Sequence, residues 1–141
     1  MSVGKLGPEN VVTTSPDSTL EEATQTLDDE NVGALVVTED DEPIGMLTDR
    51  DAALAIHDRD DVGSAPVEEI MTEDPVTLEA DDDPLAISEA IEEHNVRRFP
   101  IVDDDGELAG IATLDDLIAT IGEELDNVAD TIEAQSPDYS P

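Results

Sequence analysis

The chain has 141 residues, enough to close one hydrophobic core but too few for a multidomain enzyme. Its 39 Asp and Glu against 5 Lys and Arg give a formal charge of −34, and the resulting repulsion excludes nucleic acid and anionic membranes as partners. The absence of Cys excludes a disulfide framework, a thiolate nucleophile and a Cys-ligated zinc site. No apolar run approaches the roughly 20 residues of a membrane span, and residues 1–20 lack the pattern of a secretory signal, so we expect a cytoplasmic protein.

The acidity needs an explanation, because high charge with 1% aromatic residues is typical of disordered chains. Apolar residues nevertheless gather in blocks typical of buried strands, such as 33–37, 98–102 and 108–112, while carboxylate runs occupy the predicted turns. In composition the chain resembles proteins of halophilic microbes. A carboxylate-rich surface suits high salt, because in 1 M salt the Debye length falls to roughly 3 Å and the repulsion between carboxylates is screened. A calcium-loading role is the alternative, but no stretch has the ligand order of an EF-hand loop.

In the first half of the chain, the predicted elements follow the order β-α-β-β-α. A short strand near Val11–Val12 precedes a helix whose residues Leu20, Ala23 and Leu27 share one apolar face. Two apolar strands joined by an acidic turn follow, and a second helix begins after Thr48.

The second half repeats this order at an offset of 64 to 65 residues. Val76-Thr77 follows Val12-Thr13 by 64 residues, and after one inserted residue Thr113 follows Thr48 by 65. The apolar face of the corresponding helix consists of Ile87, Ala90 and Ile91. The pattern therefore predicts an α+β fold made of two β-α-β-β-α repeats.

We assign residues 3–62 to the first repeat, 67–122 to the second, and 123–141 to a helical extension with a frayed tail. The last helix carries an apolar stripe that outlasts the repeat. Because an apolar face needs another surface to cover it, the stripe predicts a homodimer, and folding back onto its own domain is the alternative. The stripe consists of Leu117, Ile118, Ile121, Leu125, Val128 and Ile132.

The second helix of each repeat opens with the same motif, Thr48-x-x-Asp51 or Thr113-x-x-Asp116. A Thr at a helix start with a carboxylate three residues later is close to a capping box. The same arrangement can bind a ligand, because a helix N-terminus offers N–H donors to phosphate and a carboxylate accepts hydrogen bonds from ribose hydroxyls. The spacing is compatible with both roles.

Motifs of a hydrolase, a kinase or a dehydrogenase are missing from the sequence. His57 and His94 belong to different predicted helices and form no metal-binding pair. We therefore expect no catalytic activity and no metal site.

The two halves resemble a pair of CBS domains, the repeat named after cystathionine beta-synthase. The resemblance rests on residues 31–37 (Asn-Val-Gly-Ala-Leu-Val-Val) with 45–51, and on 95–102 (Asn-Val-Arg-Arg-Phe-Pro-Ile-Val) with 110–116. Residues 67–77 also look like the opening segment of that family, whereas the first-half counterpart, Val3-Gly4-Lys5-Leu6-Gly7, lacks its Met-Thr pair.

The resemblance implies two repeats packed about a pseudo-two-fold axis, with two related clefts. It implies a regulatory ligand-sensing module, not an enzyme, that binds AMP, ADP, ATP or S-adenosylmethionine and signals to an unidentified regulated protein. Family members also commonly dimerise into a flat disc. A structural dimerisation module without a nucleotide is the alternative.

The resemblance also implies the residues of each cleft. In one cleft, the sugar would lie at Thr113 and Asp116 and the phosphate at Arg98. The adenine would lie near Val12, Val32 and Gly33. The partner cleft would consist of Thr48, Asp51, Val76, Val96 and Arg97. Because Ala34 is the first-half equivalent of Arg98, we expect unequal clefts; for both arginines, pairing with surface carboxylates is the alternative.

Overall fold

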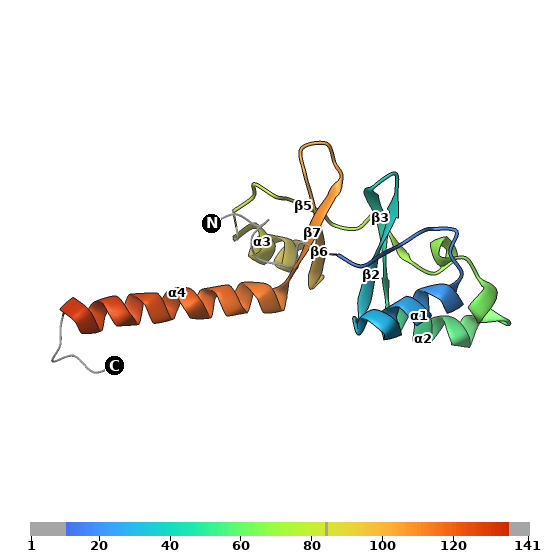
Figure 1. The fold of residues 1–141 in the computed structure, drawn as a ribbon, viewed down its shortest axis with the longest axis horizontal. Coiled ribbons are helices and arrows are strands. Elements are labelled where there is room, and N and C mark those ends of the chain that lie inside the picture. The colour runs from blue at the N-terminus through green and yellow to red at the C-terminus, as the bar shows by residue number, and fades with distance from the viewer. Residues whose placement is uncertain (1–10, 84, 136–141) are drawn as a thin grey trace.

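The computed structural model describes residues 11–83 and 85–135. The first repeat consists of β1 (Thr13–Thr14), α1 (Leu20–Glu30), β2 (Ala34–Glu39), β3 (Glu42–Thr48) and α2 (Asp49–Asp58). The second repeat consists of β5 (Leu78–Glu79), α3 (Leu85–His94), β6 (Arg98–Val102), β7 (Leu108–Thr113) and α4 (Leu114–Gln135). The predicted α+β fold of two β-α-β-β-α repeats is therefore confirmed (Figure 1).

The first strand of each repeat begins two residues later than the sequence predicts, at Thr13 and Leu78. Parallel pairing explains the difference, because Thr14 is opposite Val37 and Leu78 is opposite Ile101, both buried residues of the neighbouring strand. The partner strand therefore fixes where the short strand lies. The predicted opening segment at residues 3–7 and the predicted tail at 136–141 lie outside the described residues.

The one extra residue of the second repeat, which changes the offset from 64 to 65, lies in the turn of the second hairpin. In the first hairpin, Asp40 and Asp41 form the turn with φ values of 52° and 65°, the left-handed conformation of a two-residue hairpin turn. The longer second turn ends with Gly106 at φ 80°. The repeat also places Asn31 and Asn95, with φ of 53° and 55°, at the ends of α1 and α3, where a left-handed residue terminates a helix.

Each repeat closes its own core beneath its own sheet. The first sheet has the strand order β1-β2-β3-β4, in which β4 (Thr72–Glu73) pairs antiparallel with β3, and the second has the order β5-β6-β7. Val67, in the short 3-10 turn η3 (Val67–Glu69), is fully buried in the first core. Residues that the sequence assigns to the start of the second repeat thus complete the core and the sheet of the first.

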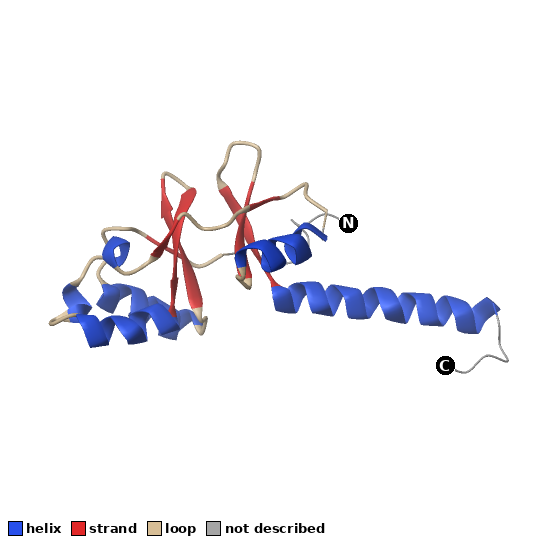
Figure 2. Ribbon diagram, turned by 180° about the vertical axis from the view of Figure 1, so that it is seen from behind, coloured by secondary structure: helices blue, strands red, loops and turns tan. Residues whose placement is uncertain are grey.

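The two sheets stand side by side, with α1 and α2 gathered next to the first sheet (Figures 1 and 2). The repeats are joined between their hairpins, where Leu108 N–H donates to the Asp41 carbonyl at 2.8 Å. Helix α4 leaves the second repeat and projects away from both sheets, and Leu117 is its buried residue. Across residues 11–83 and 85–135, we find no helix with the length and apolar character needed to cross a bilayer.

Candidate functional site

The Thr/Asp motifs form capping boxes at the start of α2 and α4. Asp51 N–H donates to Thr48 Oγ1 at 3.1 Å, and Thr48 N–H donates to Asp51 Oδ2 at 3.0 Å. Thr113 and Asp116 make the same pair of hydrogen bonds, both at 3.1 Å. The capping interpretation is therefore confirmed for both motifs. Each carboxylate uses Oδ2 in its box, and its Oδ1 accepts no hydrogen bond from the described part of the chain.

The first turn of each helix is hydrogen-bonded to the segment that precedes the first hairpin strand of its own repeat. Asp49 N–H donates to the Gly33 carbonyl at 3.0 Å, and Leu114 N–H makes the equivalent bond to the Arg97 carbonyl at 3.0 Å. The next N–H group of each helix, on Arg50 or Asp115, meets no acceptor within the described residues. Each helix therefore offers a free backbone donor where its dipole favours negative charge.

A cavity of about 440 Å³, which we call the Thr48 cleft, lies between β3, β4 and the second repeat. It brings together four residues predicted for that cleft, Thr48, Val76, Val96 and Arg97. The sequence did not assign its other lining residues to this cleft. For Thr72, Asp74 and Pro75 the reason is that β4 and the turn after it reach the site only through tertiary pairing with β3. These residues are Met46, Arg50, Thr72, Asp74, Pro75, Asn95 and Arg98.

A second cavity of about 270 Å³, which we call the Thr113 cleft, is lined by Arg97, Arg98, Thr113, Leu114 and Asp115. It unites Arg98 with Thr113, as predicted, whereas Asp116 lies behind Thr113 in the capping box. Asp51 likewise contacts its own Thr48, and it lines a separate cavity with Arg59 and Glu69.

The adenine-side residues predicted for the Thr113 cleft divide into two groups. Val12 and Val32 are half-buried and pack against the first core, outside both clefts. Gly33 lies directly beside Arg98, because a methyl group on its Cα would stand 3.4 Å from Arg98 Nη2 and 3.5 Å from Asp49 Oδ2. The side chain of Arg98 thus crosses from the second repeat to the first.

The two neighbouring arginines have different surroundings. Arg97 Nη2 lies 3.9 Å from Asp115 Oδ1, and both side chains are highly exposed, so the pair contributes little to stability. Arg98 forms no ion pair within 4.0 Å among the described residues, and it lines both clefts. Arg98 thus lies at the Thr113 cleft to which the sequence assigns it and at the Thr48 cleft as well.

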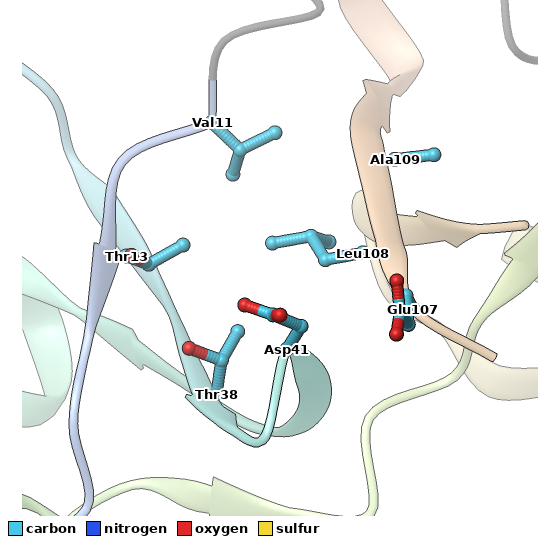
Figure 3. A pocket seen from close by; sticks show the side chains of 7 residues that line it. All are labelled: Val11, Thr13, Thr38, Asp41, Glu107, Leu108 and Ala109. Carbon is cyan, nitrogen blue, oxygen red and sulfur yellow. The ribbon is translucent and has the colours of Figure 1, made fainter. Parts of the chain in front are cut away.

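A further cavity of about 350 Å³ lies between the two hairpins, and Asp41 of the first hairpin and Glu107 of the second both line it (Figure 3). Repulsion by Asp103 raises the pKa of Glu107, and loss of water and the carboxylates of Asp41, Asp105 and Glu42 raise it further. The hairpin cavity therefore repels anions and is unsuited to phosphate.

No group of His, Asp and Glu in the described parts of the chain could hold a metal ion.

Each of the two repeats thus has a capped helix N-terminus at a cleft that arginine residues line. The sequence profile of the CBS domain matches residues 3–58 and 67–123. The chain therefore belongs to the CBS-domain family and contains a pair of these domains.

Relatives with curated names and solved structures agree with this assignment. The chain is 39% identical over 107 residues to the CBS domain-containing protein YhcV of Bacillus subtilis, covering 76% of each chain. It is similar to the CBS domain protein PAE2072 of Pyrobaculum aerophilum, complexed with AMP, at 25% identity and a TM-score of 0.74, covering 82% of this chain and 89% of that one. The CBS domain pair of protein MJ0100, complexed with 5-methylthioadenosine and S-adenosyl-L-methionine, shares the fold at 23% identity and a TM-score of 0.77, covering 88% and 98%.

Proposed function

We propose that this protein is a regulatory module that binds an adenine nucleotide or a related adenosyl compound in its clefts. The observation that carries the proposal is the meeting of a capped helix N-terminus, with its free N–H donor, and the unpaired guanidinium of Arg98 in one cleft. The AMP complex of the Pyrobaculum aerophilum protein supports it, as does the complex of MJ0100 with two adenosyl compounds.

The clefts supply separate partners for the parts of such a ligand. The N–H of Arg50 or Asp115 and the guanidinium of Arg98 suit phosphate, because charge-assisted and bidentate hydrogen bonds are stronger than neutral ones. Asp51 and Asp116 do not line the two clefts themselves, and under this proposal the ribose hydroxyls would extend past Thr48 or Thr113 to the unused carboxylate oxygen. Apolar surface for a base comes in the Thr48 cleft from Met46, Pro75, Val76 and Val96.

Calorimetric titration with AMP, ADP, ATP and S-adenosylmethionine in molar KCl tests the proposal. Binding of at least one ligand, weakened by Asp116→Ala or Asp51→Ala, is the expected result. A folded protein that binds none of the four ligands would instead support the structural dimerisation module.

A second copy of the chain is the proposed partner of α4. Its exposed apolar residues alternate at steps of three and four, the a/d spacing of a coiled coil, and each is 40% to 65% exposed. Gly122 and Ala129 flank this seam without charge, and Glu124 alone places a carboxylate beside it. Because each copy carries −34, two copies can approach most easily along a seam with few charges. The seam consists of Ile118, Ile121, Leu125, Val128 and Ile132.

Signalling and salt adaptation complete the proposal. Binding between the repeats would favour one arrangement of the two sheets, and a regulated protein could sense it through differential contacts. The carboxylate-rich surface suits a salt-rich interior, where screening weakens its self-repulsion. Loss of helical circular dichroism during dialysis from molar KCl into dilute buffer is expected. Full retention of a cooperative melt in dilute buffer would contradict salt adaptation.

A further inference from the structure

Arg98 stands at the boundary between the two clefts. It lines the Thr48 cleft together with Arg50, and it lines the Thr113 cleft beside Leu114 and Asp115. Arg59 pairs with Glu69 and Arg97 with Asp115, whereas Arg98 has no carboxylate within 4.0 Å among the described residues. Its positive charge is therefore available to a ligand on either side.

The repeat explains why one residue can reach both clefts. Arg98 pairs with Thr113 across β6 and β7, as Ala34 pairs with Thr48 across β2 and β3. Arg98 reaches across the junction of the repeats, because its Nη2 lies 3.4 Å from the position that a Cβ on Gly33 would occupy. Because Ala34 has no polar side chain, this pair of equivalent positions supplies one guanidinium where a symmetric pair would supply two. Arg97 also lines both clefts, but its Nη2 lies 3.9 Å from Asp115 Oδ1, and Arg50 lines only the Thr48 cleft.

We propose that the two clefts share Arg98, so that an anionic ligand bound in one cleft weakens the binding of an anionic ligand in the other. A bidentate contact with one phosphate commits the guanidinium fork to that side. The second phosphate then lacks this cation and is repelled by the first. Since a charge-assisted contact accounts for roughly a ten- to hundredfold change in affinity, we expect coupling of about that size. The inference rests on the proposed function and adds a coupling between its sites.

Coupling must be separated from a simple inequality of the clefts, because both produce two steps in a titration. Under the proposed function Asp51 and Asp116 each contact the sugar of one ligand, so Asp51→Ala and Asp116→Ala should each disable one cleft and report the affinity of the other cleft while its neighbour is empty. Stepwise AMP dissociation constants of the parent are then compared with these two values. Coupling through Arg98 predicts that the product of the parent constants exceeds the product of the single-cleft constants by about ten- to hundredfold.

Two comparisons identify the source of the coupling. Adenosine, which lacks phosphate, should bind both clefts of the parent without coupling, and Arg98→Ala should abolish the coupling of AMP. Arg50→Ala is the matched control, because Arg50 lines the Thr48 cleft but not the Thr113 cleft. This variant should bind AMP more weakly in the Thr48 cleft and leave the coupling unchanged.

The shared-arginine inference would be overturned if the product of the parent's AMP dissociation constants equals or falls below the product of the single-cleft constants. Coupling that survives Arg98→Ala would also overturn it. Each of these results would leave the proposed function in place. Binding of neither AMP nor adenosine by the folded parent would overturn both.

Discussion

Replacing Asp116 separates a role in folding from a role in binding. Its Oδ2 accepts the Thr113 N–H at 3.1 Å, so Asp116→Ala removes one part-buried hydrogen bond. We expect a loss of about 1 kcal/mol of stability from that bond. Loss of a charged acceptor for the ligand should weaken AMP binding by about 1.5–3 kcal/mol, which is roughly ten- to hundredfold.

Thermal unfolding and calorimetry with AMP, both in molar KCl, measure the two effects on the same samples. Asp116→Asn keeps an oxygen that can accept the Thr113 N–H, so it should retain most of the stability while binding AMP more weakly than the parent. Asp115→Ala is the contrasting variant at the neighbouring position, because Asp115 lies outside the capping box and lines the Thr113 cleft. Removing that carboxylate should tighten the binding of a phosphate ligand. Adjacent substitutions are thus expected to change affinity in opposite directions.

The ligand role of Asp116 is refuted if Asp116→Ala melts at a lower temperature than the parent but binds AMP equally tightly. That result would leave the carboxylate as a helix cap alone. Weaker binding after Asp115→Ala would show that the local field at the Thr113 cleft does not govern affinity.

Three further predictions concern the hairpins, the first sheet and α4. Because neighbouring carboxylates raise the pKa of Glu107, the folded state gains stability as pH falls through that pKa and loses it as pH rises. Glu107→Gln should therefore raise the melting temperature at neutral pH, at the lowest salt that supports folding, and reduce the gain in stability in acid. The melting temperature of the control Glu123→Gln should stay near that of the parent. Gly45→Ala should lower the melting temperature, because its Cβ would meet Met71 Sδ and stand 3.0 Å from the Thr72 carbonyl, whereas Gly122→Ala, with nothing within 4 Å, should add about 1 kcal/mol of stability. Leu125→Asp should convert a dimer to a monomer in light scattering while Asp126→Ala does not, and an unchanged mass for Leu125→Asp would place any dimer contact elsewhere.

The features that could be predicted from sequence are those set by local spacing. The capping boxes depend on residues three apart, and the buried face of α1 depends on Leu20, Ala23 and Leu27 at helical spacing. The repeat offset means that an element predicted in one half also predicts the equivalent element in the other half. Periodicity also gave the two hairpins, because their apolar strands are separated by acidic turns.

The features that could not be predicted depend on contacts between distant segments. Val67 carries no local sign that it belongs to the first core, and β4 becomes a strand only because β3 offers it an edge. The Thr48 cleft gains Thr72 and Asp74 for the same reason. In the Thr113 cleft, spacing correctly associates Arg98 with Thr113, but its reach to Gly33 requires the packing of the two repeats.

The two copies differ at the junction of the repeats and agree in the scaffold. Positions that form the scaffold are the same in both repeats, as in the Thr/Asp boxes and the terminating Asn31 and Asn95. Positions at the junction differ, since Gly33 is matched by Arg97 and Ala34 by Arg98. A small residue in one copy therefore leaves space that a long cation of the other copy can occupy. An exchange such as Ala34→Arg should change ligand preference with little effect on the fold, because position 34 pairs with Thr48, which lines the Thr48 cleft, and lies outside the first core.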